Sequence, residues 1–365
     1  MALQNQHASI AAVPIRARVQ ESVMSKLLAF LIKTSLVVAL FAYLILRALK
    51  GSAFSELNLD SLLPGYLFLG FLFNLAATIV TIIRWRYLVQ ALDVPLSFSD
   101  AMKFGFIGFM FNLSPVGIVG GDAVKVYLLA RKTNTPVDRA TASVIVDRVL
   151  GLYAMFVLGL IVVFATGFHH RTEPLALFAT RGLVALAIAT TIFLALVVAP
   201  SSRKNRRLRL AATIPFVGEI MKKLTAATMI YRERKKVLLL SFAATFFVHS
   251  GFAVSLYCFA KGLFQHAPSL VDHLILYCVG NVGSIVPLSA GPLEFFLDEL
   301  YPLFEIAGRD SFVAGHGTAI GVAYRLATVG VAVVGVAYYF FARSDVREAL
   351  SAADEPQSVD ASSAE

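Results

Sequence analysis

Two stretches of the sequence place a carboxylate and an arginine, in the same order, behind a proline. In each stretch the carboxylate follows the proline by seven residues, and the arginine follows the carboxylate by 26 or 31 residues. The positions are Pro115, Asp122 and Arg148 in the first stretch and Pro287, Glu294 and Arg325 in the second. An arginine at such a place can bind an anionic group, or it can hold a carboxylate in a structural ion pair. Both uses stay open for Arg148, whose structural partner would be Asp122 or Glu294.

Six residues of these stretches are candidates for binding an anionic substrate. They are Asn112, Asp122, Lys125, Arg148, Glu294 and Arg325. Asp122 is equally suited to cap a helix over residues 123–130, because a carboxylate stabilises a helix N-terminus. Lys125 is expected at the cytoplasmic membrane interface, where its ammonium can reach water or a phosphate.

Other polar residues lie inside or beside apolar runs. Arg84-Trp85-Arg86-Tyr87 closes one such run, and this composition is typical of an interfacial anchor. Asp147 is expected to face the protein interior together with Arg148, because a charge facing lipid costs about 2.5–3.5 kcal/mol. His249 stands alone in a predicted span and is a candidate proton relay.

The elements that position these groups are membrane helices. Hydrophobic residues make up 58% of the 365 residues and charged residues 15%, which is outside the usual balance of soluble domains. A helix needs about 20 apolar residues to cross a bilayer. Six runs meet this requirement, near residues 27–46, 65–83, 144–166, 175–199, 237–260 and 318–341. We therefore predict an all-α polytopic membrane protein with about six transmembrane helices.

Two further apolar segments, 101–119 and 273–290, are interrupted by glycine and proline. Residues that would shape the breaks are Pro115, Gly120, Gly121, Pro287 and Gly291. A broken helix leaves backbone groups unpaired, which lipid does not tolerate, so such segments are expected to line a polar cavity. We predict that each segment is a re-entrant hairpin that enters and leaves the membrane on the same side.

The distribution of charge predicts the orientation. The linker over residues 200–236 carries eleven lysines and arginines against Glu219 and Glu233, so it is expected in the cytoplasm. The segment 288–311 carries five carboxylates against Arg309 and is expected outside. The cytoplasm would then hold both termini, with an N-terminal segment over residues 1–24 and a disordered acidic tail over residues 344–365.

The two hairpins imply an internal repeat within a membrane domain covering residues 25–343. Each half, about 25–167 and about 175–343, would contain two spans, a hairpin and a third span. Three crossings per half invert the second copy relative to the first, which is an architecture of transporters.

The motifs in the first half are similar to those of a known family. Pro115-Val-Gly-Ile-Val-Gly-Gly-Asp122, Lys125 with Tyr127, and Val146-Asp-Arg148-Val-Leu-Gly151 resemble the transmembrane region of the lysylphosphatidylglycerol synthase family. The resemblance extends to its flippase-like, stand-alone relatives and covers roughly residues 25–343. Leu288 and Ser289 stand where the family usually has glycines, and Lys125 stands where an arginine is common.

The resemblance implies a domain that moves a lipid between leaflets. The lipid would be an anionic, aminoacylated or hopanoid-type lipid of the cell membrane. The aminoacyl-transferring members carry a soluble catalytic domain after the membrane region, and this chain ends about 22 residues after its last span. Lysyl transfer by this chain alone is therefore not expected.

Three functional classes remain open from the sequence. The leading one is a lipid translocator, for which we expect membrane lipids as partners, no cofactor, no metal and no nucleic acid, and which leaves oligomerisation open. Without a nucleotide-binding motif, ATP is not expected to drive it directly. The second is a membrane-embedded enzyme of lipid or polyprenyl-phosphate metabolism that uses Asp122, Asp147 or Glu294. The third is a non-catalytic scaffold that binds a partner through the basic linker.

Overall fold

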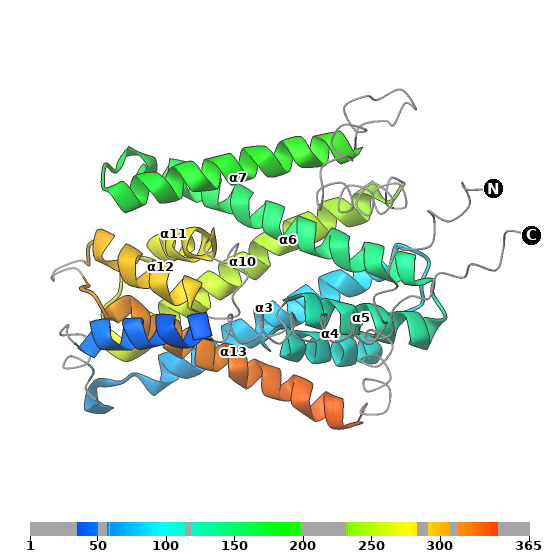
Figure 1. The fold of residues 1–365 in the computed structure, drawn as a ribbon, viewed down its shortest axis with the longest axis horizontal. Coiled ribbons are helices and arrows are strands. Elements are labelled where there is room, and N and C mark those ends of the chain that lie inside the picture. The colour runs from blue at the N-terminus through cyan, green and yellow to red at the C-terminus, as the bar shows by residue number, and fades with distance from the viewer. Residues whose placement is uncertain are drawn as a thin grey trace, which may run out of the picture.

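The computed structural model describes residues 35–49, 57, 59–113, 118–198, 231, 233–282, 291–306 and 312–341. These residues form α-helices joined by short turns, without a β-strand in the described ranges (Figure 1). The helices are Ser35–Leu49, α3 (Pro64–Gln90), α4 (Phe98–Asn112), α5 (Ile118–Thr133), α6 (Val137–Ala165), α7 (Pro174–Val198), α10 (Lys235–Phe264), α11 (Leu270–Gly280), α12 (Pro292–Leu300) and α13 (His316–Phe341).

Five of these helices are long and apolar enough to cross a membrane, and they coincide with five of the six predicted spans. They are α3, α6, α7, α10 and α13. Exposed side chains such as Leu239, Leu240 and Phe247 on α10 cover their outer faces. The predicted first span is represented by the helix Ser35–Leu49, because its earlier residues lie outside the described part. The protein is thus a polytopic, all-α membrane protein, as predicted.

The short helices form two pairs at opposite ends of the molecule. Figure 1 shows α4 and α5 at one end of the long axis and α11 and α12 at the other. The helices α4 and α5 have 15 and 16 residues, or about 23 Å each, which is less than the roughly 30 Å of a bilayer core. The helices α11 and α12 are shorter still, at 11 and 9 residues. The hairpin tips, including Pro115 and Pro287, lie outside the described residues.

Loop contacts define the two ends. At the end that we call the basic end, the turn over residues 91–97 meets the start of α10, where Arg234 binds Asp93 through both carboxylate oxygens at 2.7 and 3.0 Å. At the opposite end, Gln265 donates to the carbonyl of Ser61 at 2.8 Å. The α4–α5 pair begins and ends at the basic end, and the α11–α12 pair begins and ends at the opposite end (Figure 1).

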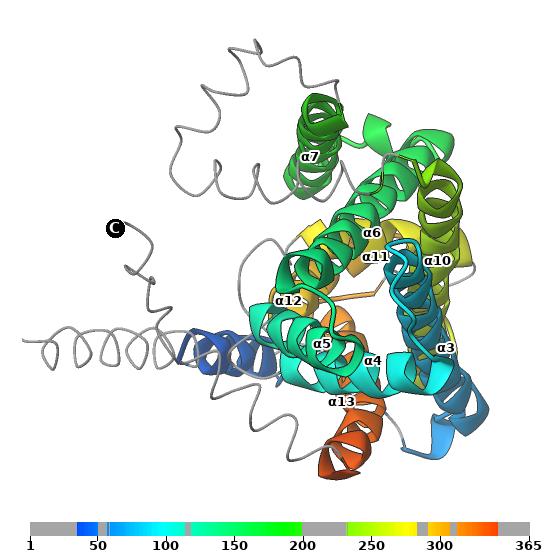
Figure 2. The same ribbon diagram turned by 90° about the vertical axis from the view of Figure 1, so that its right-hand side faces the viewer.

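The two halves pack with two-fold pseudosymmetry. Along one side of the molecule α3 and α10 lie antiparallel and in contact along their lengths (Figure 2). Leu63 bonds to Gly262 at one end of this interface, and Arg84 bonds to Thr245 near the other. The main contacts of the two hairpins correspond, because α4 packs on α13 as α11 packs on α6, and α5 packs on α6 as α12 packs on α13. This is the packing of an inverted repeat.

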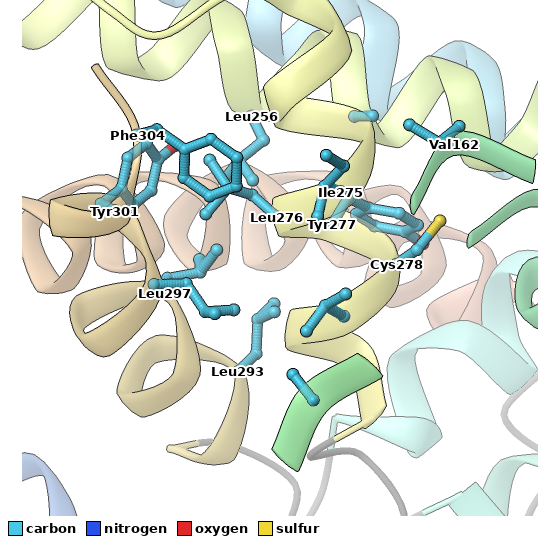
Figure 3. Close-up of a cluster of buried hydrophobic side chains, with 14 of the residues drawn as sticks. Val162, Leu256, Ile275, Leu276, Tyr277, Cys278, Leu293, Leu297, Tyr301 and Phe304 are labelled. Carbon is cyan, nitrogen blue, oxygen red and sulfur yellow. The ribbon is translucent and has the colours of Figure 1, made fainter. Parts of the chain in front are cut away.

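A separate buried cluster holds each hairpin. Around α4 and α5 the fully buried side chains include Trp85, Ile107 and Leu129. Around α11 and α12, Ile275 and Leu276 of α11 face Leu297 of α12 and the aromatic residues that follow it (Figure 3). Between membrane helices such side chains stabilise the packing through van der Waals contact rather than by leaving water. The hairpins are therefore firmly packed parts of the protein.

The helix Ser35–Leu49 is tied to the second half. Its Arg47 lies 3.4 Å from a carboxylate oxygen of Asp298 and forms an ion pair with Glu299 on the same helix, α12. The other oxygen of Asp298 accepts the backbone N–H groups of Gly315 at 2.7 Å and Thr318 at 3.0 Å. Asp298 therefore caps the start of α13 and anchors the first helix at the same time.

Candidate functional site

The first predicted ion pair is formed between α5 and α6. Arg148 donates from Nε to Asp122 Oδ2 at 2.9 Å and from Nη2 to Asp122 Oδ1 at 2.8 Å. This bidentate arrangement is the strongest hydrogen-bonding geometry between an arginine and a carboxylate. The pair is accessible, since 40% of the Arg148 side chain and 19% of the Asp122 side chain are exposed.

The capping role considered for Asp122 is wrong. The helix α5 begins at Ile118, so Asp122 lies inside it, where backbone N–H groups already have helical partners. Gly121 does not break the helix but lets α4 and α5 approach each other. A Cβ at Gly121 would collide with the carbonyl of Gly108 and the side chain of Asn112. Asn112 is thereby placed beside the residue that precedes Asp122.

Because α4 and α5 approach closely, alanine substitution should affect stability differently at Gly121 and at Gly182. Gly121→Ala should lower the free energy of unfolding by about 1–3 kcal/mol, because backbone atoms block the new methyl group. Gly182→Ala on α7 should be neutral or stabilising, by at most about 1 kcal/mol, because nothing lies within 4 Å of its Cβ position. The midpoint of thermal unfolding in detergent measures both changes. Equal midpoints for the two variants would contradict the close packing of α4 on α5.

The second half has an ion pair between α12 and α13 that was not predicted. Arg325 donates from Nε to Glu294 Oε1 at 2.7 Å, and the other oxygen of Glu294 accepts the N–H of Gly291 at 2.8 Å. Gly291 has a φ of +105°, which favours glycine, and a Cβ there would also collide with Leu40. Glu294 is fully buried and Arg325 is 22% exposed. The second pair is therefore the more enclosed of the two.

The repeat thus places each carboxylate against the arginine of its own half. The alternative pairing of Arg148 with Glu294 does not occur, because Glu294 pairs with Arg325. The substrate-binding roles of these residues, of Asn112 and of Lys125 remain predictions.

A third ion pair was not predicted. Arg84 on α3 donates to the carboxylate of Asp147 at 2.9 Å, to its backbone carbonyl at 3.2 Å and to Thr245 Oγ1 on α10 at 2.6 Å. Both members of the pair are buried. Arg84 and Trp85 are buried inside the protein and do not present their side chains to the membrane surface as an interfacial anchor would. The sequence feature that could have predicted this ion pair is the presence of opposite charges, Arg84 and Asp147, in two different apolar runs.

Lys125 is buried within the protein, and its ammonium does not reach outward as predicted. Its ammonium nitrogen lies 4.1 Å from the centroid of the Trp85 ring, which is a cation–π contact. Trp85 is held in turn by a hydrogen bond from its indole N–H to Ser143 at 3.2 Å. The prediction failed because the face of α5 that carries Lys125 packs on α4, where a Cβ at Gly108 would meet the stem of Lys125.

These residues form one group, which we call the charged cluster. Its members are Arg84, Asp122, Lys125, Asp147 and Arg148. Three cations and two carboxylates give it a net charge of +1 at neutral pH. The second ion pair, Glu294 with Arg325, is neutral. The cluster therefore has an unbalanced positive charge that suits an anion, and its Arg148 edge is exposed.

A histidine lies next to the charged cluster. His249 on α10 bonds through Nε2 to the carbonyl of Gly151 on α6 at 3.0 Å and through Nδ1 to the hydroxyl of Tyr277 on α11 at 3.4 Å. Gly151 lies one turn after Asp147 on α6, so both residues share a face. Among the described residues, no three histidine, cysteine, aspartate or glutamate side chains are grouped so that they could hold a metal ion.

The fold and the site define a class of protein: a polytopic membrane domain built from an inverted repeat, with an arginine–carboxylate pair at each hairpin. Residues 28–335 match the family described as "Lysylphosphatidylglycerol synthase TM region", and the chain belongs to this family. This agrees with the resemblance seen in the motifs.

Several curated relatives are UPF0104 membrane proteins. The protein of Methanothermobacter thermautotrophicus is 24% identical over 321 residues, which cover 81% of this chain and 86% of that protein. The alignment with the protein of Methanocaldococcus jannaschii is 28% identical but covers 29% of this chain and 33% of that protein. The protein of Pyrococcus horikoshii is 27% identical over an alignment that covers 35% of this chain and 39% of that protein. No solved structure is significantly similar to this chain.

Proposed function

We propose that this protein translocates lipids with an anionic head group between the two leaflets of the cell membrane. The observation that carries the proposal is the accessible Arg148–Asp122 pair, which joins the short helix α5 to the spanning helix α6 within a cluster of charge +1. A head-group phosphate can replace Asp122 as the acceptor of the two N–H groups of Arg148. Arginine binds carboxylate and phosphate through the same pair of donors, because the oxygen atoms of both groups fit the planar edge of the guanidinium. The family's link to lysylphosphatidylglycerol supports a lipid as the substrate.

The pseudosymmetry extends the proposal to the second hairpin. Arg325 with Glu294 stands in the second half where Arg148 with Asp122 stands in the first, and the two hairpins start from opposite ends (Figure 1). A lipid moving between leaflets passes from one end of the molecule to the other. We propose that the first pair receives the head group nearer the basic end and the second pair serves it nearer the opposite end.

The orientation belongs to the same proposal. Arg131, Lys132 and Arg139 lie around the turn between α5 and α6, at the basic end. Positively charged loops stay in the cytoplasm during insertion. We therefore propose that the basic end faces the cytoplasm, together with both termini, which lie outside the described residues.

The ion pairs also favour a transporter over an enzyme. Asp122, Asp147 and Glu294, the three carboxylates considered for acid–base chemistry, each accept hydrogen bonds from an arginine. A carboxylate whose oxygen is already bonded to an arginine is poorly placed to take a proton from a substrate. Binding and release of an anion need only that the arginine changes its partner.

The test is leaflet-specific labelling of lipids in liposomes that contain the purified protein. Phosphatidylglycerol, its lysyl ester and a hopanoid lipid are compared with phosphatidylcholine as the neutral control. We expect protein-dependent movement of anionic lipid and a fall of at least tenfold in Arg148→Ala. Arg181→Ala is the matched control, because Arg181 is an exposed arginine on the spanning helix α7. Wild-type protein that moves none of these lipids would refute the proposal, and full activity in Arg148→Ala would remove the head-group role.

A further inference from the structure

His249 is a titratable residue between three helices, and both of its ring nitrogens are hydrogen-bonded. It lies where α10, α6 and α11 meet, and its two ring nitrogens contact one residue from each neighbouring helix, Gly151 and Tyr277. Its side chain is partly buried. The lipid-binding proposal does not use this group, although Gly151 belongs to the same sequence motif as Asp147 and Arg148.

The hydrogen bonds of His249 determine its tautomer. The carbonyl of Gly151 can only accept, so Nε2 carries the proton and donates to it. In the neutral imidazole Nδ1 is then an acceptor, and the hydroxyl of Tyr277 donates to it. A proton added at Nδ1 makes this nitrogen a donor, and the hydroxyl must turn to accept. In both states the two ring nitrogens keep their partners, so the imidazole can gain or lose one proton without losing a hydrogen bond.

The charged cluster touches the same glycine. A Cβ at Gly151 would lie 3.6 Å from Nη2 and 3.8 Å from Nη1 of Arg84. Arg84 also bonds to Thr245, which is one turn before His249 on α10. The Arg84 guanidinium and the imidazole are therefore neighbours along one face of α6 and one face of α10.

Few other titratable groups face His249. Arg84 approaches from α3, Asp147 lies beside Arg84 on α6, and Tyr277 comes from α11. From α13, Tyr324 lies behind Tyr277 and is separated from His249 by the ring of Phe252, which contacts both tyrosines. The full charges nearest to the imidazole are thus those of the charged cluster, which is +1 in total. A second positive charge on His249 is opposed by this cluster until an anion enters it.

From this juxtaposition we infer that His249 is a proton-binding site coupled to the anion site of the charged cluster. When an anionic head group joins the cluster, its negative charge offsets Arg84 and Arg148, and Nδ1 of His249 takes one proton from the aqueous phase. The Tyr277 hydroxyl rotates from donor to acceptor. When the head group leaves, the proton returns to water. One proton is thus carried with each head group, an inference that rests on the proposed lipid translocation.

Calorimetric binding tests this coupling without requiring transport. A short-chain phosphatidylglycerol is titrated into the full-length protein in two buffers with different ionisation enthalpies, between pH 5.5 and 8.5. The difference between the buffers gives the number of protons taken up per lipid bound. Wild-type protein should take up a proton, and its affinity should rise as the pH falls, by up to tenfold per pH unit for one coupled proton.

Three variants separate coupling from structure. His249→Gln keeps an N–H donor for Gly151 but has no titratable group, so binding should persist without proton uptake and without the pH dependence. Tyr277→Phe keeps the aromatic packing and removes the hydroxyl that pairs with Nδ1 in both states. Because the hydrogen bond to the charged imidazolium is the stronger of the two, the pH profile should shift to lower pH. His169→Gln is the control, because His169 lies at the opposite end and bonds to Val163. It should behave as the wild type.

The outcomes distinguish the two proposals. Lipid binding and transport with no proton uptake, or an unchanged pH profile in His249→Gln, would overturn the proton site and leave the translocator intact. Wild-type protein that neither binds nor moves anionic lipid would overturn both. A proton-sensitive dye inside the liposomes provides the second readout, since lipid movement should change the internal pH with the wild type but not with His249→Gln.

Discussion

Asp147→Asn should destabilise the protein by about 3–5 kcal/mol, because it leaves the Arg84 guanidinium buried without its counter-ion. An asparagine can still accept a hydrogen bond from Nε, but it supplies no charge. Arg84→Met should have a similar effect, because it leaves the Asp147 carboxylate unpaired. The fraction of protein that remains monodisperse after heating in detergent measures the loss.

The double variant makes this prediction specific. Arg84→Met combined with Asp147→Leu removes both charges and should recover most of the stability lost in either single variant, since buried ion pairs contribute little net stability over apolar side chains. Asp93→Asn is the control, because its pair with Arg234 is 78% exposed on the carboxylate side and should change the stability by less than about 1 kcal/mol. Single variants as stable as the wild type would contradict the buried pair.

The two repeat-related arginines should differ in what their removal does. Arg325→Ala leaves Glu294 fully buried with one backbone hydrogen bond, so we expect a loss of about 3 kcal/mol in stability. Arg148→Ala leaves Asp122 partly exposed, and we expect a loss of less than about 1 kcal/mol. Thermal midpoints of the two variants, prepared in parallel, test the difference.

A second substitution shows whether the buried carboxylate is the cause. Glu294→Gln added to Arg325→Ala removes the unpaired charge and keeps an acceptor for the N–H of Gly291, so stability should largely return. The corresponding addition of Asp122→Asn to Arg148→Ala should change the stability little, because Arg148→Ala by itself is expected to lose little. Equal losses in Arg148→Ala and Arg325→Ala, or no rescue by Glu294→Gln, would show that the second site is not more enclosed than the first.

The spans could be predicted from the sequence because they are encoded locally. A run of about 20 apolar residues is sufficient to define a spanning helix, and five such helices are present among the described residues. The repeated order of proline, carboxylate and arginine identified the four charged residues of the two pairs, but it left Asp122 and Glu294 as alternative partners of Arg148 and named no partner for Arg325. The family resemblance rested on the same residues.

The burial of individual charges could not be predicted in this way. Whether Arg84 and Lys125 reach the interface depends on which helix covers them, and those helices, α6 and α4, are distant in the sequence or beyond a turn. Asp122 was equally suited to a helix start, because a Gly-Gly pair either breaks a helix or allows close packing. Only the neighbouring α4 decides between the two uses of Gly121.

The anchoring of the first helix by Asp298 has a consequence for biosynthesis. Arg47 is among the first residues to enter the membrane, but its partner is synthesised 251 residues later (298 − 47). At about 5–20 residues per second, the ribosome needs roughly 13–50 s to reach Asp298. During this interval neither Arg47 nor the face around Leu40 has its final partner. The second half of the chain must therefore be inserted before the first helix can take its native place.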